Sequence, residues 1–588
     1  MKRGQVISGK VTKVTFPNKG IMETAEGDKL RIKGVLPGQT VTARVKKSSH
    51  DKAEAMLISV DEPSPLELKE SACPHFGICG GCTYQSLPYE VQLDLKAGMV
   101  KDLLLPVVGE DCLNSTFEGI KASPKQFCYR NKMEFSFGDE MKDGPLTLGM
   151  HKKGSFYDVV TVDQCQIIDE DLRLVLKLTL DYFTRAGVPY YRKGNHVGYL
   201  RFLLVRKAAK TEEILIDLIT STQNEAFDEE ALLSDWVKTL TECSDFNGKI
   251  AGILHTFDDR EADVVSDEGT TVLYGQDFFT EELLGLSFKI TPFSFFQTNS
   301  LGAEVLYETA RDFIMNPASL PEGGVAEVSS TPASLSEGGV ARSATEGVTG
   351  SFSEVFDLYS GTGTIAQIIA PAAGHVTGVE IIEEAVEAAK VNAGLNGLTN
   401  CDFIAGDVLK VLDDIKEKPD YIILDHPRDG INPKALEKII DYGVESLVYI
   451  SCKPTSLARD LERFLYRGYE VKRVACVDMF PGTYHVETCV LLSKLHVDKH
   501  IDLEITTDEF DLTSVESKAT YEKIRNYVAE NNDGMKVTNL YIAQVKAKHG
   551  IIERENYNLP KSENSRQPQC PDDKAKAIEE ALRYFQMI

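Results

Sequence analysis

Long hydrophobic runs are missing from this chain of 588 residues, although 42% of its residues are hydrophobic. No stretch of roughly 18 uncharged apolar residues occurs, so the sequence predicts no membrane-spanning helix. The first residues, MKRGQVISGKVTKV, lack the apolar block of a signal peptide. The content of Leu, Ile, Val and Phe is ordinary for a folded chain, which excludes global disorder. We therefore expect a folded, cytoplasmic protein.

Basic side chains are also scarce, with 64 Lys and Arg against 90 Asp and Glu and a formal net charge of −26. At face value this charge argues against a nucleic-acid partner, because phosphates repel an acidic chain. The charge is unevenly spread. Residues 1–60 hold 12 basic and 5 acidic side chains, or +7, whereas residues 207–315 hold 7 basic and 22 acidic ones, or −15. The chain therefore begins with a basic module.

Paired CxxC motifs, which are typical of zinc ribbons, are absent as well. The chain has 12 cysteines, and without an export sequence they predict free thiols, metal ligands or catalytic groups in place of a disulfide frame. Cys73, Cys79 and Cys82 lie close together, and Cys165 follows downstream. Four thiolates can hold zinc or a [4Fe–4S] cluster, and the spacing also lacks the CxxxCxxC motif of radical-SAM enzymes.

Shifts in composition and periodicity predict four domains and one insert. The short alternating runs of residues 1–62 predict a small antiparallel β-barrel of TRAM or OB type. Residues 63–290 mix strands with helices, as in an α+β domain, and residues 291–494 contain an α/β Rossmann-like domain. A polar duplication, PASLPEGGVA and PASLSEGGVA, marks a flexible insert at 315–350. Residues 495–588 predict a small helical accessory module that binds a partner.

Strand-like runs alternate with helical patterns from about residue 353 to 494, which predicts a mostly parallel sheet with helices on both faces. Ligands of such sheets lie beyond the carboxyl ends of the strands. The first strand ends at a turn containing Gly361 and Gly363, the second ends at Glu380, and the third ends at Asp407. These positions suit a nucleoside cofactor, and the missing third glycine of GxGxxG favours S-adenosylmethionine (SAM) over a dinucleotide.

Three chemically active side chains follow later strands of the same sheet: Asp425, Cys452 and Glu487. A thiolate that adds to C6 of a pyrimidine makes C5 nucleophilic enough to take a methyl group. A base must then remove the C5 proton before the thiol can leave. Cys452 fits the nucleophile and Glu487 the base. Taken alone, a cysteine at a strand end is more often a small buried apolar residue.

Several motifs together carry a family resemblance. They are Cys73-x5-Cys79-Gly-Gly-Cys82 with Cys165, Phe296-Gln297-x-Asn299, DLYSGTGTIA, Gly378-Val-Glu380, Asp425-x-Pro427-Arg428, SCxP followed by LARDL, and MFPGTYHVET. With these motifs, residues 1–494 resemble the RNA (uracil-5-)-methyltransferases, most closely the 23S rRNA branch.

The resemblance implies roles for individual residues. It makes Cys452 the nucleophile and Glu487 the base that removes the proton, and it makes the basic barrel a TRAM RNA-binding domain. The SAM site would be lined by Gln297, Tyr359, Thr364, Glu380, Asp407 and Asp425. A [4Fe–4S] cluster would be held by Cys73, Cys79, Cys82 and Cys165.

The favoured partner is 23S rRNA. A tRNA uracil-5 or RNA cytosine-5 methyltransferase is the alternative within the same chemistry. A nonenzymatic iron–sulfur protein that binds RNA or senses redox state is the alternative of another class, and the intact Cys452 and Glu487 argue against it.

Some positions depart from the family pattern. His426 and Lys453 stand where Pro and Asn are usual, and Ser360 and Thr364 stand where Cys and Asn are common. A cation at Lys453 would lower the pKa of the Cys452 thiol if its side chain pointed inward. The alternative is a solvated loop residue.

Overall fold

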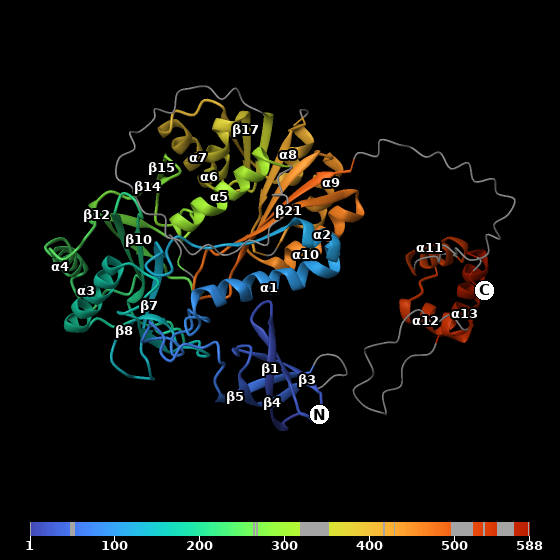
Figure 1. The fold of residues 1–588 in the computed structure, drawn as a ribbon, viewed down its shortest axis with the longest axis horizontal. Helices are drawn as coiled ribbons and strands as arrows, with labels where there is room; N and C mark the ends of the chain where they lie inside the picture. The colour runs from blue at the N-terminus through green and yellow to red at the C-terminus, as the bar shows by residue number, and fades with distance from the viewer. Residues whose placement is uncertain are drawn as a thin grey trace. The chain divides into compact units, whose positions relative to one another are not determined.

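The structure, a computed structural model, divides into two compact units, Met1–His496 and Val497–Ile588 (Figure 1). It describes residues 2–47, 53–262, 265, 268–317, 352–415, 418–428, 430–495, 521–532, 535–549, 570–585 and 587. From residue 318 onward, the predicted insert lies outside these residues. No helix within the described ranges is long and apolar enough to cross a membrane.

A closed five-stranded barrel begins the first unit, with the strand order β1-β2-β3-β5-β4. Its strands are β1 (Val6–Thr15), β2 (Lys19–Glu23), β3 (Lys29–Lys33), β4 (Thr40–Lys47) and β5 (Glu54–Glu62). Val41, Ala43 and Val45 of β4 are buried, and more exposed residues alternate with them. Since successive side chains of a strand point to opposite faces, this alternation fills the barrel with apolar groups.

A seven-stranded sheet forms the middle of the first unit, in the order β13-β12-β11-β10-β7-β8-β9. Its strands are β7 (Lys132–Gly138), β8 (Thr147–His151), β9 (Val159–Thr161), β10 (Leu200–Lys207), β11 (Glu213–Thr220), β12 (Lys249–Phe257) and β13 (Thr270–Gly275). Helices α3 (Glu170–Ala186) and α4 (Glu229–Thr241) contribute Phe183 and Trp236 to the core that includes Phe135 of β7. The hairpin of β14 (Phe279–Leu283) and β15 (Leu286–Ile290) follows.

An eight-stranded sheet completes the first unit, in the order β18-β17-β16-β19-β20-β22-β21-β6. Its strands are β6 (Phe117–Lys121), β16 (Phe352–Leu358), β17 (Ala373–Glu380), β18 (Cys401–Ala405), β19 (Tyr421–Asp425), β20 (Ser446–Ser451), β21 (Tyr469–Val477) and β22 (Glu487–Lys494). The five strands from β16 to β20 pair in parallel, and β22 is antiparallel to both β20 and β21.

Helices cover both faces of this sheet (Figure 1). Val355 and Ile423 pack in one core with α5 (Ser300–Met315), α6 (Thr364–Ile369) and α7 (Glu383–Leu395). Phe356 and Ile422, one position away, pack in the other core. That second core contains α1 (Tyr89–Val108), α2 (Glu110–Thr116), α8 (Val408–Asp414), α9 (Pro433–Tyr442) and α10 (Pro454–Tyr466). The predicted doubly covered, mostly parallel sheet is therefore confirmed.

One predicted boundary is wrong, because part of the region 63–290 belongs to the large sheet. Strand β6 pairs in parallel with β21. Val100 and Leu104 of α1 lie in the same apolar core as residues of α10. The apolar face of α1 is buried against the large sheet, so α1 and β6 extend that sheet although they precede the middle sheet in sequence.

Within its described residues, the second unit forms a small bundle of three helices, α11 (Tyr521–Asn531), α12 (Asn539–Lys548) and α13 (Asp572–Tyr584). Ile524, Ile542 and Ile578 are fully buried in its core, one from each helix. The Thr538 side chain accepts a hydrogen bond from the Tyr541 amide and so caps α12.

A buried ion pair joins α1 to the loop that follows β21. Lys96 Nζ lies 2.6 Å from Asp478 Oδ1, and both side chains are fully buried. Lys96 Nζ also donates a hydrogen bond to the Phe480 carbonyl at 3.0 Å. A charge in this position is tolerated only because its partner is present.

We expect Lys96→Met to lower the free energy of unfolding by about 3–5 kcal/mol, because it leaves the Asp478 carboxylate buried without its cation. The shift of the urea unfolding midpoint measures this loss. Lys13→Met is the matched control, since Lys13 and Asp102 form an exposed pair whose removal costs at most about 1 kcal/mol. Equal midpoints for Lys96→Met and the wild type would contradict the prediction.

Candidate active site

A pocket of about 1190 Å³ opens at the carboxyl ends of β16, β17, β19 and β20. Most of the predicted catalytic and cofactor residues line it. They are Gln297, Tyr359, Gly361, Thr364, Glu380, Asp425, Cys452 and Glu487. Gly363 and Asp407 are not among the lining residues. The parallel strands bring these groups together because their carboxyl ends meet at one edge of the sheet.

The turn after β16 has left-handed backbone at Tyr359 (φ 68°), Gly361 (φ 54°) and Gly363 (φ 71°). A Cβ atom on Gly361 would meet only Phe295 Cδ1, at 3.9 Å, so this glycine borders open space. A Cβ atom on Gly363 would lie 2.5 Å from Phe403 Cε1 and 2.8 Å from Ala389 Cβ. Gly361 therefore lets a ligand approach the backbone, whereas Gly363 allows close packing beneath the turn.

Backbone amides hold the Glu380 carboxylate at the end of β17. Its Oε2 accepts from the Gly361 amide at 3.0 Å, and its Oε1 accepts from the amides of Ile381 and Ile382 at 2.9 and 3.0 Å. Oε2 accepts only one of these hydrogen bonds, so its second lone pair can accept from a ligand hydroxyl. Asp407 instead caps α8, where its Oδ1 accepts from the Leu409 amide at 3.0 Å.

Strand register places the thiol beside the carboxylate. Ser451 of β20 pairs with Thr488 of the antiparallel strand β22, so Cys452 and Glu487 occupy the next opposed positions. On the other side, Asp425 ends β19 and pairs with Ile450. Three acidic groups thus meet at one pocket wall.

Burial shifts the pKa values of these groups. Desolvation, the negative charge of Glu487 and that of Asp425 raise the pKa of Cys452 to about 11, while the positive charge of Arg428 opposes the shift. Desolvation and the charge of Asp425 raise the pKa of Glu487 to about 8. Without a ligand, both groups therefore hold their protons more strongly than they would in water.

The cation that acts on the thiol is Arg428, a residue of the Asp425-x-Pro427-Arg428 motif that lines the pocket and was not predicted as a site residue. The Lys453 side chain is exposed, so the solvated alternative holds for it. His426 is buried, its Nδ1 lies 2.7 Å from the Pro427 carbonyl oxygen, and its ring packs edge-on against Tyr449. Burial lowers the pKa of His426, so it adds no positive charge at neutral pH.

Other lining residues were missed although they adjoin predicted ones. Phe295 and Ile381 are 70% and 65% exposed and line the pocket next to Phe296-Gln297 and Glu380. Tyr307 is hydrogen-bonded to the Gln297 side chain. An apolar residue directly beside a predicted polar site residue is a sequence feature that could have identified the first two.

The four cysteines of the predicted cluster line another wall of the same pocket. Burial and the neighbouring thiols raise the pKa of Cys82 to about 12, and the pKa of Cys165 is raised to about 11, mainly by burial. Cys82 Sγ accepts a hydrogen bond from Gln85 Nε2 at 3.2 Å. In the part of the chain that the structure describes, no three His, Cys, Asp or Glu side chains are grouped so that they could hold a metal ion. All 12 cysteines are free thiols.

The loop between β21 and β22, residues 478–486, leads directly to Glu487. Its backbone is held by several side chains and amides: Asn299 Nδ2 donates to the Met479 carbonyl at 2.8 Å, and Tyr129 Oη donates to the Pro481 carbonyl at 2.9 Å. The amide of Thr83, next to Cys82, donates to the Gly482 carbonyl at 2.7 Å. The loop is therefore fixed both by the wall that bears the cysteines and by the α/β domain.

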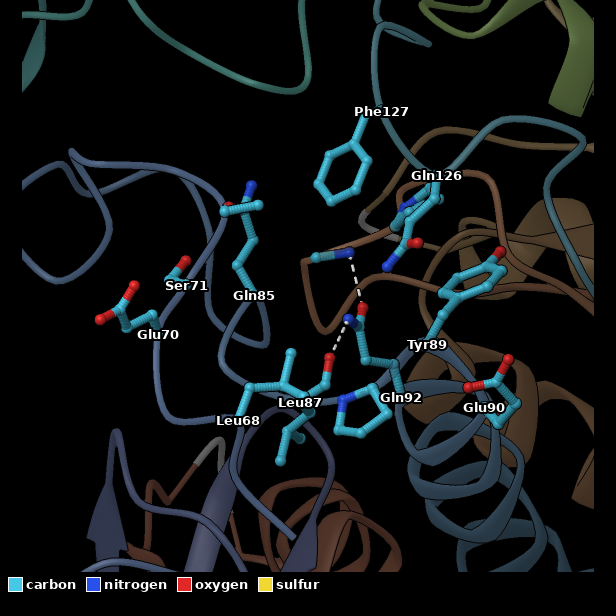
Figure 2. Close-up of a pocket in the computed structure, with 14 residues that line it drawn as sticks. Leu68, Glu70, Ser71, Gln85, Leu87, Tyr89, Glu90, Gln92, Gln126 and Phe127 are labelled. Carbon is cyan, nitrogen blue, oxygen red and sulfur yellow. Dashed lines mark hydrogen bonds between the residues drawn. The ribbon is translucent and has the colours of Figure 1, made fainter.

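A smaller pocket of about 510 Å³ lies behind this loop (Figure 2). Pro481 and Gly482 line the small pocket, whereas Phe480 and Thr483 line the large one. The side chain of Gln92 in α1 is hydrogen-bonded to the loop that lies between the two pockets. Its Oε1 accepts from the Gly482 amide at 2.8 Å (Figure 2). Its Nε2 donates to the Leu87 carbonyl at 2.9 Å.

The sheet, the glycine turn and the acid after the second strand define the class of methyltransferase-like α/β proteins. Comparison with known proteins agrees. The family profile described as tRNA (uracil-5-)-methyltransferase matches residues 340–495. An uncharacterized RNA methyltransferase of Caldanaerobacter subterraneus is 45% identical over 496 residues, covering 84% of this chain and 100% of the relative. One of Clostridium tetani is 44% identical over 494 residues, covering 84% and 99%.

Among solved structures, the Pyrococcus abyssi tRNA (uracil-54, C5)-methyltransferase in complex with S-adenosyl-L-homocysteine shares the fold. Its TM-score is 0.59 at 23% identity, and the match covers 83% of this chain and 100% of that one. The chain belongs to the RNA methyltransferase family of these relatives, and it is therefore an enzyme.

We expect Arg428→Met to slow alkylation of Cys452 by iodoacetamide at pH 8. Loss of the cation raises the thiol pKa further, and only the thiolate reacts. Mass spectrometry of the Cys452 peptide measures the rate separately from the other cysteines. Arg428→Lys is the control, because it keeps the charge. Equal or faster alkylation of Arg428→Met would show that Arg428 does not favour the thiolate.

Proposed function

We propose that the enzyme methylates C5 of uridine in RNA, with SAM as methyl donor, through a covalent adduct between Cys452 and C6. The observation that carries this proposal is the register of β20 and β22, which sets the Cys452 thiol beside the Glu487 carboxyl in the pocket that Gly361 and Glu380 also line. RNA in a duplex hides C5 and C6 in the base stack, so the uridine must be extruded into the pocket.

The reaction follows from what each side chain can do. SAM, when bound, would supply a methyl group on a positively charged sulfonium, and the methyl–sulfur bond would break with its electron pair left on sulfur as a neutral thioether. The Cys452 thiolate forms a bond to C6, and the electron pair of the C5–C6 double bond becomes available at C5 to take the methyl group. Glu487 then accepts the C5 proton, the C5–C6 double bond re-forms, and the bond between sulfur and C6 breaks. Arg428 favours the thiolate form of Cys452 both before it adds to C6 and after the bond between sulfur and C6 breaks.

The cofactor side of the pocket supports SAM binding through residues of this chain. The fixed Glu380 carboxylate can accept from ribose hydroxyls, and Gly361 leaves room for the ligand. Ile381 and Phe295 offer exposed apolar surface on which an adenine ring can lie. Asp407 and Gly363 act indirectly, by capping α8 and supporting the turn.

We favour 23S rRNA as substrate, because the basic barrel and the four cysteines resemble that branch. Twelve basic and five acidic residues in positions 1–60 give the barrel the charge that phosphate binding requires, and we assign it as a TRAM-like RNA-binding domain. A tRNA substrate is the second candidate, and the names of the matched profile and of the Pyrococcus enzyme favour it.

We also propose that Cys73, Cys79, Cys82 and Cys165 hold a [4Fe–4S] cluster with a structural role. The donor set fits, because the four cysteines line one pocket and Cys73, Cys79 and Cys165 lie near enough to Cys82 to act on it electrostatically. Each would bind a different iron of the cluster without converging on one point. Bound iron would stabilise the thiolate form that burial otherwise opposes.

The cluster proposal predicts a loss of iron that can be measured directly. Anaerobically purified protein should contain about four iron and four sulfide per chain, and Cys79→Ser should lower both. Cys243→Ser is the matched control on a cysteine outside the set. Wild-type protein that binds zinc and no sulfide would contradict the proposal.

The mechanism predicts opposite behaviour of two variants. With RNA and SAM, Glu487→Gln should accumulate a covalent protein–RNA adduct, because C5 keeps its proton and the thiol cannot leave. Cys452→Ala should form no adduct and no product while still binding RNA. Denaturing gel electrophoresis with labelled RNA measures both. Product formation by Cys452→Ala would exclude the covalent route.

A further inference from the structure

The hairpin between β8 and β9, residues 152–158, exposes two adjacent aromatic rings. Phe156 is 60% and Tyr157 is 65% exposed. Their rings pack edge to face with centroids 5.3 Å apart. Two large exposed rings side by side on a folded protein mark an interaction surface more often than an accident of packing. Neither ring lines the active-site pocket.

The hairpin backbone is organised to hold these rings. Lys152 N donates to the Asp158 carbonyl at 2.9 Å, and Ser155 N donates to the Lys152 carbonyl at 3.0 Å. Ser155 Oγ accepts from the amides of Tyr157 and Asp158 at 3.3 and 3.1 Å. The rings are therefore presented on a closed turn and need little ordering when a ligand binds.

One lysine lies over an exposed ring, and two more belong to the hairpin. Lys193 Nζ lies 5.0 Å from the centroid of Phe156, and the His151 ring lies parallel to Phe156 with centroids 6.3 Å apart. Lys152 and Lys153 belong to the hairpin itself. The acidic neighbours are Asp158 in the hairpin and Glu140, whose carboxylate lies 3.6 Å from Lys152 Nζ. Flat rings flanked by lysines suit a polyanion with stacking faces.

Backbone hydrogen bonds join the hairpin to the wall of the active-site pocket. Lys153 N donates to the Ile78 carbonyl at 2.7 Å, and Gly80 N donates to the His151 carbonyl at 3.0 Å. Cys79 and Gly81, on the same loop as Ile78 and Gly80, line the pocket that contains Cys452. The hairpin that bears the rings is thus hydrogen-bonded to a loop that lines the active-site pocket.

We propose that Phe156 and Tyr157 form a stacking platform for an unpaired base of the RNA near the target uridine. The inference rests on the proposed RNA substrate. It adds a second point of attachment, which would hold the strand while the target uridine is extruded. A single-stranded segment is the occupant that fits, because a base offers a flat face and its phosphate offers the charge that Lys153 and Lys193 can meet.

Fluorescence can test the stacking directly, because the chain has one tryptophan, Trp236, which is fully buried. Phe156→Trp in the full-length protein places an indole on the platform. Titration with a 20-nucleotide single-stranded RNA of mixed sequence should quench it. Met141→Trp is the matched control on a neighbouring loop, since Met141 is 66% exposed, and its fluorescence should change little. Equal responses of the two variants would overturn the proposal.

Affinity provides the second test. Replacing both rings by alanine should weaken binding of the same RNA about tenfold, as expected for loss of base stacking. Phe156→Trp should retain wild-type affinity for the RNA. A variant whose hairpin had unfolded would not retain it. On an RNA that the wild type methylates, the double variant should raise KM and leave kcat unchanged. Unchanged RNA affinity of the double variant would overturn the platform and leave the rings to a protein partner.

The fluorescence and affinity measurements do not depend on catalysis. If the wild type methylated no RNA, the proposed function would fail while quenching and affinity still reported on the platform. If the wild type methylated RNA and the ring variants bound it normally, the platform alone would fail.

Discussion

The buried ion pair between Lys96 and Asp478 is the constraint on which the active site depends. It stands between α1, the first long helix of the chain, and the loop that leads to Glu487. Because neither charge can reach water, each requires the other in place. Lys96 also binds the Phe480 carbonyl and Gln92 binds the Gly482 amide, so α1 fixes the loop backbone. A helix that precedes the middle sheet thus positions the loop that leads to Glu487 at the edge of the large sheet.

Burial and negative charge raise the pKa values of two groups at the pocket wall. Desolvation raises the pKa of both the Cys452 thiol and the Glu487 carboxyl, the charge of Asp425 adds to both shifts, and the charge of Glu487 adds to that of Cys452. Arg428 is the opposing cation. The wall therefore favours the protonated forms of the Cys452 thiol and the Glu487 carboxyl.

The sequence predicted much of the large sheet and the positions of Cys452 and Glu487 at its edge, because both follow local patterns. Alternating strands and helices predicted the parallel order, and strand ends placed Cys452 and Glu487 at one edge. What it could not supply was long-range pairing: β6 joins β21 across more than 300 residues of chain. The sequence also does not reveal the direction of side chains. It therefore could not show that Arg428, and not Lys453, acts on the thiol, or that Asp407 caps a helix. The exposed rings of Phe156 and Tyr157 follow from tertiary exposure, which no spacing reveals.

Isotope labelling can detect methyl transfer to C5 of uridine in RNA without any assumption about the intermediate. RNA from a strain that lacks this protein is incubated with the purified enzyme and SAM that carries a trideuteriomethyl group, and the nucleosides of separated 23S rRNA and tRNA are analysed by mass spectrometry. We expect labelled 5-methyluridine in 23S rRNA. Label on another nucleoside, or on no RNA, would contradict it.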